Sequence, residues 1–243
     1  MDEQRSSELR RCLKLNVDSD FIEEICVFAE GGEELLPENP KIKVRQVSQR
    51  PTYSSYFDWI SELAGQDDIS IIANTDIYFD QQLRFFSYWA IPSQCALALA
   101  RWETSALRKS TLLDRNDSQD AWIFRGPLKE VKGDFCVGVP RCDNRMLNEL
   151  KQAGYEVINP SFSIRSYHLH EGVREEYQND NLEHFVEPPY AYLWPHNLWS
   201  LPRTLIHNLR HPDARISWRI DRRKFLNSLP MRAMRKVIGG FSS

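Results

Sequence analysis

The 243-residue sequence contains no apolar run that approaches the roughly 18–20 residues needed to cross a bilayer. Its first residues, MDEQRSSELRR, are charged and do not have the pattern of a secretory signal. The five cysteines include no closely spaced CxxC pair, which argues against a zinc ribbon and against a disulfide framework. These absences favour a reducing compartment, and we expect the protein in the cytoplasm.

What the chain does contain is typical of a globular protein with an uneven charge distribution. Apolar residues make up 42% and charged residues 27%, which argues against a disordered chain. The net charge is −3, yet the segment 203–236 holds ten Lys and Arg residues against two Asp residues, a balance of +8, which leaves −11 for the remainder. We therefore divide the chain into an acidic domain, residues 1–186, and a basic tail that contains Pro and Trp, residues 187–243.

The basic tail has two interpretations. Its basic residues alternate with Met, Leu and Phe, as in segments that lie on an anionic bilayer, where lipid-linked acceptors reside. The protein would then sit at the periphery of a membrane. Alternatively, the tail is a solvated helix that packs on the domain. A nucleic acid partner is disfavoured because the domain itself is acidic.

The periodicity of the domain predicts alternating strands and helices. We expect α/β structure, with a mostly parallel central sheet flanked by helices and a helical or irregular basic tail, because strands alternate with helices in the first third of the chain. The expected strands are 22–29, 42–47, 69–73, 95–102, 121–124, 155–158 and 163–170, and the expected helices are 6–15, 52–63 and 143–153. In such sheets ligands bind beyond the carboxyl ends of the strands.

The segment that leaves the apolar strand 69–73 is the first candidate for chemistry. It reads Asn74-Thr75-Asp76-Ile77-Tyr78-Phe79-Asp80. A carboxylate at Asp76 can hold a divalent cation that also binds a diphosphate, since Mg²⁺ and Mn²⁺ accept one or two protein oxygens together with substrate phosphates. The alternative is that Asp76 caps a helix that starts at Ile77.

A second carboxylate, Asp143, lies at the front of a predicted helix, after the loop that starts at Gly138. A helix N-terminus keeps a carboxylate ionised, so Asp143 can act as general base for an acceptor hydroxyl. Here too the alternative is a helix cap.

Two further groups of polar residues have similar alternatives. On a strand, His168 and His170 point to the same face, where they are either metal ligands or exposed side chains. Asp117 and Asp120 can bind sugar hydroxyls, with Trp122 as a stacking wall, although a turn followed by a strand explains the same residues.

Together these segments resemble the metal-dependent glycosyltransferases of the GT-A fold. NTDIYFD is similar to the DxD metal-binding region of that family, and GVPRCDNRMLNELKQAGYEVINPSFSIRSYHLH resembles its glycine loop, its acid-bearing helix and its closing histidine ligand. The resemblance covers roughly residues 10–170.

The resemblance implies a function and a set of roles. The chain would be a hexosyltransferase-like enzyme of polysaccharide biosynthesis, which moves a sugar from a nucleotide-sugar to a hydroxyl of a glycan or lipid-linked saccharide with inversion. Asp143 would be the catalytic base, and Mn²⁺ or Mg²⁺ would bind Asp76 with His168 or His170, of which His170, at the end of the motif, is favoured. The residues that would bind the donor and its cation are Asn74, Asp76, Asp120 and Gly138.

The chain departs from the family pattern in two places. Asn74 stands where the family has the first Asp of its motif, and the chain begins in the helix that usually follows the first strand. These differences keep two alternatives in view: a non-catalytic or degenerate relative that binds sugar or nucleotide, and a metal-dependent hydrolase.

Overall fold

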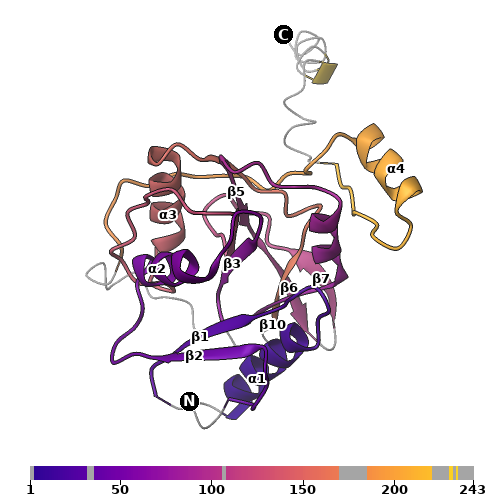
Figure 1. Ribbon diagram of the computed structural model, residues 1–243. Coiled ribbons are helices and arrows are strands. Elements are labelled where there is room, and N and C mark those ends of the chain that lie inside the picture. The colour runs from indigo at the N-terminus through magenta and orange to yellow at the C-terminus, as the bar shows by residue number, and fades with distance from the viewer. Residues whose placement is uncertain are drawn as a thin grey trace.

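The computed structural model describes residues 3–31, 36–105, 108–169 and 185–220, and residues 230, 231 and 234 (Figure 1). The helices are α1 (Glu3–Val17), α2 (Tyr53–Leu63), α3 (Cys142–Gln152) and α4 (Leu201–Arg210), with a 3₁₀ helix at Gln81–Ser87. The strands are β1 (Ile25–Ala29), β2 (Ile42–Gln46), β3 (Ile69–Ala73), β4 (Ile77–Phe79), β5 (Cys95–Leu99), β6 (Arg101–Ser105), β7 (Arg108–Leu112), β8 (Ala121–Arg125), β9 (Glu156–Ile158) and β10 (Ser166–Leu169).

Two of the helices form for reasons that are visible in the sequence. α2 begins after Thr52, whose side chain accepts a hydrogen bond from the backbone N–H of Ser55. α3 buries Met146, Leu147 and Leu150 completely and ends at Gly154, which adopts the left-handed conformation of a helix terminus. Both helices were predicted, and the structure confirms them.

The expectation of a mostly parallel central sheet is wrong. The strands form a two-stranded parallel sheet, β1-β2, and two mixed four-stranded sheets, β3-β8-β5-β9 and β4-β10-β6-β7. β8 lies between β3 and β5 and is antiparallel to both. The prediction failed because α2 connects β2 to a strand of a different sheet, and because β3 pairs, among the described strands, only with β8, which comes much later in the chain.

The core surrounds the sheet that contains β5 and β8, and its side chains alternate between two faces. Ala96 and Ala98 on β5, with Trp122 and Phe124 on β8, pack against α2 and α3, whereas Leu97 and Ile123 face the 3₁₀ helix on the other side. Both faces are therefore buried, which explains the continuous apolar runs. Trp122 is 2% exposed within this core, so its predicted role as a sugar-stacking wall is wrong.

The chain crosses between the two four-stranded sheets at two places. β5 continues through Ala100 into β6, and β3 continues through the segment 74–76 into β4. Asp120, just before β8, is hydrogen-bonded to both crossings. Its N–H donates to Leu99 O, at the end of β5, and its carbonyl oxygen accepts from the N–H of Asn74, just after β3. We call this place, where both crossings meet the start of β8, the sheet junction.

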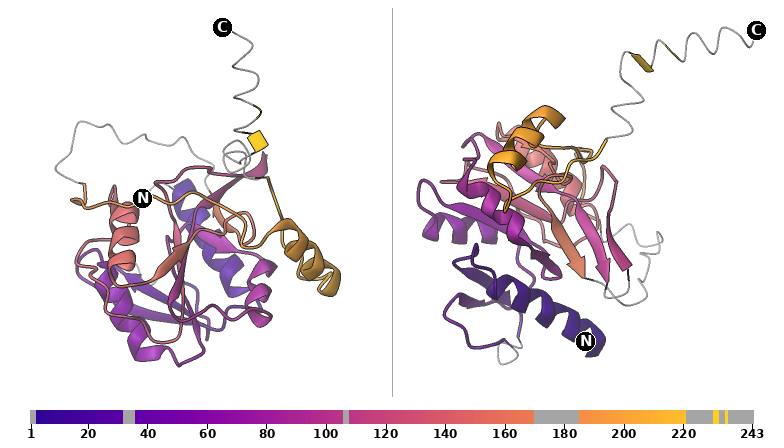
Figure 2. Two further views of the ribbon diagram at one scale, coloured as in Figure 1. Left: turned by 90° about the horizontal axis from the view of Figure 1, so that it is seen from above. Right: turned by 90° about the vertical axis from the view of Figure 1, so that its right-hand side faces the viewer.

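Segments beyond the sheets complete the fold (Figure 2). The stretch 186–199 runs across the domain, where the Val186 N–H donates to Pro140 O and the Ala191 N–H donates to Asn144 O. α4 follows at the outside of the molecule (Figure 2). Within the described residues, no helix combines the length and the apolarity that crossing a bilayer requires.

Gly126, which follows β8, provides a test of this packing. It has a φ of +69°, and a Cβ atom there would lie 2.5 Å from the backbone oxygen of Gln66. We predict that Gly126→Ala lowers the free energy of unfolding by about 1 kcal/mol from the left-handed backbone and by about a further 1–3 kcal/mol from the clash. Urea denaturation measures this loss.

Gly154→Ala is the matched control, because its φ is +80° and its nearest neighbour would be Lys129 Nζ at 3.6 Å. It carries the backbone strain without the clash. Equal losses for the two variants would show that the approach of Gln66 to β8 is not as tight as the structure has it.

Candidate functional site

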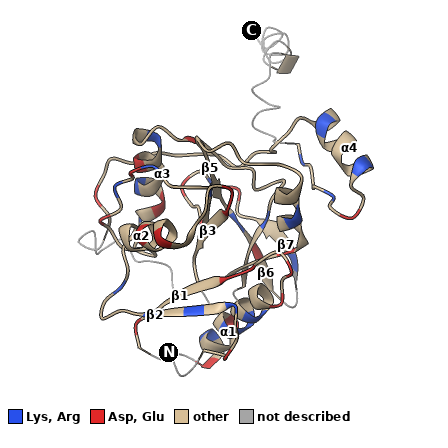
Figure 3. Cartoon of the chain, viewed as in Figure 1, with Lys and Arg blue, Asp and Glu red and all other residues tan. Residues whose placement is uncertain are grey.

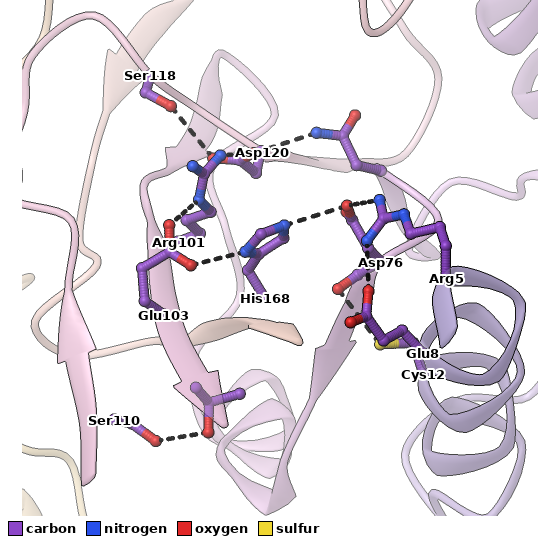
Figure 4. A network of polar contacts seen from close by, with 12 residues as sticks. Arg5, Glu8, Cys12, Asp76, Arg101, Glu103, Ser110, Ser118, Asp120 and His168 are labelled. Atoms are coloured by element: carbon purple, nitrogen blue, oxygen red, sulfur yellow. Dashed lines mark hydrogen bonds and ion pairs between the residues drawn. The ribbon is translucent and has the colours of Figure 1, made fainter. Parts of the chain in front are cut away.

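A largely buried series of ion pairs is centred on β10, one of the two inner strands of the sheet β4-β10-β6-β7 (Figure 4). His168 lies on β10, in register with Glu103 on β6. Its Nδ1 is 2.7 Å from Glu103 Oε2, and its Nε2 is 3.1 Å from Asp76 Oδ2. The imidazole therefore joins one carboxylate on each side.

The chain of charges continues from Glu103 to the sheet junction. Arg101 Nε donates to Glu103 Oε1 at 2.6 Å, and Arg101 Nη1 donates to Asp120 Oδ1 at 2.8 Å. Asn74 Nδ2 donates to the same oxygen of Asp120 at 3.1 Å. The side chains of Arg101 and Asp120 are only 6% and 4% exposed. We refer to Asp76, His168, Glu103, Arg101 and Asp120 as the junction network.

The charges of this network stabilise one another. Burial disfavours the charged imidazole of His168, but hydrogen bonds with Asp76 and Glu103 outweigh it and raise its pKa to about 9. Burial likewise opposes ionisation of Asp76 and Glu103. The hydrogen bond with His168 and the neighbouring cations outweigh this effect, so the pKa of Asp76 lies well below its usual range and the pKa of Glu103 is lowered to about 2. At neutral pH His168 is thus an imidazolium that donates from both nitrogens.

α1 brings a further cation to the network. Arg5 Nη2 lies 2.5 Å from Asp76 Oδ2, and Arg5 Nη1 lies 3.0 Å from Glu8 Oε2. The helix is fixed along β4, because Asn16 donates to Ile77 O and accepts from the N–H of Phe79, and the Cys12 thiol donates to Asp76 O. Figure 4 shows Arg5 reaching from α1 to the Asp76 carboxylate.

Asp143 lies in the first turn of α3 and is half-buried. Burial, followed by the charge of Asp120, raises its pKa above the ordinary Asp value, although the Cys142 thiol and the Gln119 N–H donate to it. The expectation that the helix N-terminus lowers the pKa of Asp143 is therefore wrong. A base with a raised pKa is nevertheless suited to accept a proton near neutral pH.

The structure decides the capping alternatives for both carboxylates. Asp76 precedes the strand β4 instead of a helix, so it is not a helix cap. The N-cap of α3 is Arg141, in the left-handed conformation and without a side-chain cap, so Asp143 is not the cap either. The capping interpretations are thus wrong, and both side chains take part in the electrostatics of the junction.

The structure brings most of the predicted site residues together. Asn74, Asp76, Asp120 and His168 are connected through the junction network, and Asp143 interacts with it through Asp120. Gly138, with a φ of +75°, has open space where a side chain would be. His170 lies outside the described residues. Asp117 pairs with Arg115 at 2.8 Å.

Sequence reasoning missed three members of the site, namely Arg5, Arg101 and Glu103. A signal for two of them exists: the apolar run CALALA passes directly into Arg-Trp-Glu, where Arg101 and Glu103 are two residues apart and share a strand face. Charged residues that continue a buried strand need partners. No comparable signal marks Arg5 on its polar helix.

The described residues do not form a ready metal site. They contain no group of three His, Cys, Asp or Glu side chains arranged to hold a metal ion. Asp76 Oδ2 already faces Arg5 and His168, and only Oδ1, which is buried without a hydrogen-bond partner, is an available acceptor. Asp76 and His168, which were expected to bind a metal together, are in contact, but they form an ion pair with each other.

Comparison with known protein families, curated proteins and solved structures finds no match for this chain. We therefore infer its function from the geometry of the junction network and Asp143.

Arg101 offers a test of the network, because it lies between two carboxylates. We predict that Arg101→Met lowers the free energy of unfolding by about 3–5 kcal/mol, since it leaves Asp120 buried without its cation. Adding Asp120→Asn should recover part of the lost free energy, because it removes the unpaired negative charge. Urea denaturation of the single and double variants measures both effects.

Arg115→Met is the control. Arg115 makes a bidentate ion pair with Asp117, but its side chain is 59% exposed. Arg115→Met should therefore lower the free energy of unfolding by about 1 kcal/mol or less. A cost for Arg101→Met no larger than that of the control would contradict a buried, paired network.

Proposed function

We propose that the chain is a glycosyltransferase that moves a sugar from a nucleotide-sugar to an acceptor hydroxyl on a saccharide or lipid-linked saccharide. The observation that supports this most is the position of Asp143, a half-buried carboxylate with a raised pKa beside the junction network. Glycosyl transfer needs such a base together with positive charge for an anionic leaving group.

In the proposed reaction Asp143 accepts the proton of the acceptor hydroxyl. The hydroxyl oxygen then forms a bond to the anomeric carbon, and the bond from that carbon to the phosphate oxygen breaks, with its electron pair left on the diphosphate. Attack opposite the leaving group inverts the anomeric centre. A positioned base contributes about 10²–10⁴ in rate.

The leaving diphosphate needs positive charge. Arg101 is buried between two carboxylates, and His168 is similarly enclosed. The side chain of Arg5 is 34% exposed, so it is the cation at the network that a bound diphosphate reaches most easily. A guanidinium also matches phosphate oxygens with two parallel hydrogen bonds.

A divalent cation, Mn²⁺ or Mg²⁺, would bind here only together with the diphosphate. The His168 imidazolium has no free nitrogen for a metal and Asp76 alone does not complete a coordination shell, so the phosphates would have to supply most ligands. When bound, the ion would neutralise charge on the leaving group.

We also propose a cytoplasmic location, at the periphery of a membrane where lipid-linked acceptors reside. All five cysteines are free, and three of them, Cys12, Cys95 and Cys142, are buried. Unpaired thiols are usual in a reducing compartment.

Asp143→Asn tests the proposed base. We predict that it lowers transfer from a panel of UDP- and GDP-sugars to saccharide acceptors by about 10²–10⁴, while the thermal stabilisation by the same donor persists. In the native protein the acid limb of the rate should lie above about pH 4, the ordinary Asp range, because the base works only when deprotonated.

Asp58→Asn is the control, since Asp58 is exposed on α2, and it should transfer at the native rate. Unchanged transfer by Asp143→Asn would remove Asp143 as base. Donor binding without any transfer by the native chain would identify a degenerate relative, and sugar released to water with no acceptor product would identify a hydrolase.

A further inference from the structure

α4 presents its polar side to the protein and its apolar side to solvent. Thr204 and His207 are buried, and His207 Nε2 lies 3.1 Å from Ala214 O. Asn208 donates to Ile216 O and accepts from the N–H of Ile216. The opposite face carries four exposed apolar residues, with exposed fractions of 39% for Leu201, 53% for Leu205, 51% for Ile206 and 82% for Leu209.

This arrangement is the reverse of an ordinary surface helix, which buries its apolar face. The hydrogen bonds of His207 and Asn208 with the segment 214–216 hold the helix in this orientation. At 100° per residue, Leu201, Leu205 and Leu209 form one stripe, with Ile206 beside it. A contiguous apolar stripe of this kind marks an interaction surface.

The charges around the stripe favour an anionic partner. Arg203 and Arg210, both exposed, are seven residues apart and flank the stripe on one side, and α4 contains no acidic residue (Figure 3). The nearby Asp213 is paired with Arg84. A second copy of the chain is disfavoured, because a symmetric contact would bring the same arginines to both sides with no carboxylate between them.

We propose that α4 docks on an anionic phospholipid surface, with its leucines among the acyl chains and Arg203 and Arg210 at the headgroup phosphates. An interfacial helix has this combination of an apolar face and basic flanks. Its position at the outside of the fold leaves it accessible to a flat surface (Figure 2).

Vesicle co-sedimentation of the full chain tests this surface. Phosphatidylcholine vesicles that contain phosphatidylserine should bind the protein, and Leu205→Gln/Leu209→Gln should weaken binding at least tenfold. Arg203→Gln/Arg210→Gln should weaken it about tenfold on anionic vesicles and leave binding to pure phosphatidylcholine unchanged, because each basic residue contributes through the surface potential.

Leu63→Gln is the matched control, since Leu63 is 44% exposed at the end of α2, away from α4. It should bind as the native chain does, and all variants should keep the native thermal midpoint. Native binding by the Leu205/Leu209 variant would overturn the proposal. So would a dimer, seen by sedimentation velocity, that this variant abolishes, because α4 would then be covered by a second copy.

Discussion

The fold depends on keeping six alternating charges in contact where its two mixed sheets meet. From Asp120 through Arg101, Glu103, His168 and Asp76 to Arg5, each charge has an opposite charge as neighbour. These residues come from β6, β10, α1 and the segments before β4 and β8. Separation of Arg101 from Asp120 would leave a buried charge without its partner, which is far more costly than the loss of an exposed pair.

Such a network does not explain stability by itself. Well-packed apolar side chains of similar volume often serve a core as well as buried ion pairs do, because desolvation offsets the attraction between the charges. The apolar core of this molecule is formed by β5 and β8, which are buried on both faces, and by the sides of α2 and α3 that pack on them. The charges lie at the edge of that core, where two strands change sheets, so they fix the relative position of the sheets and also form a candidate site. The raised pKa of Asp143 beside them agrees with this interpretation, since perturbed carboxyls gather at functional sites.

Local features of the fold could be read from the sequence, and long-range pairing could not. The helix at α3 and the strand at β3 follow from apolar spacing and from Gly154, and both are where the pattern predicts them. The antiparallel direction of β8 between β3 and β5 could not be predicted in this way. A strand buried on both faces reads as a uniform apolar run, and such a run contains no information about which neighbour it pairs with or in which direction.

The same distinction applies to the site. Asp76, Asp120 and His168 could be found because polar residues adjoin apolar strands, but their partners depend on which strands become neighbours. α4 shows the limit most clearly. The sequence left open whether the tail packs on the domain or lies on a bilayer. In the structure His207 and Asn208 find hydrogen-bond partners in the segment 214–216, and the apolar stripe faces outward. Burying His207 and Asn208 without partners would cost more than exposing a few leucines. Their hydrogen bonds therefore account for the orientation of α4, which leaves its apolar stripe at the surface of the described residues.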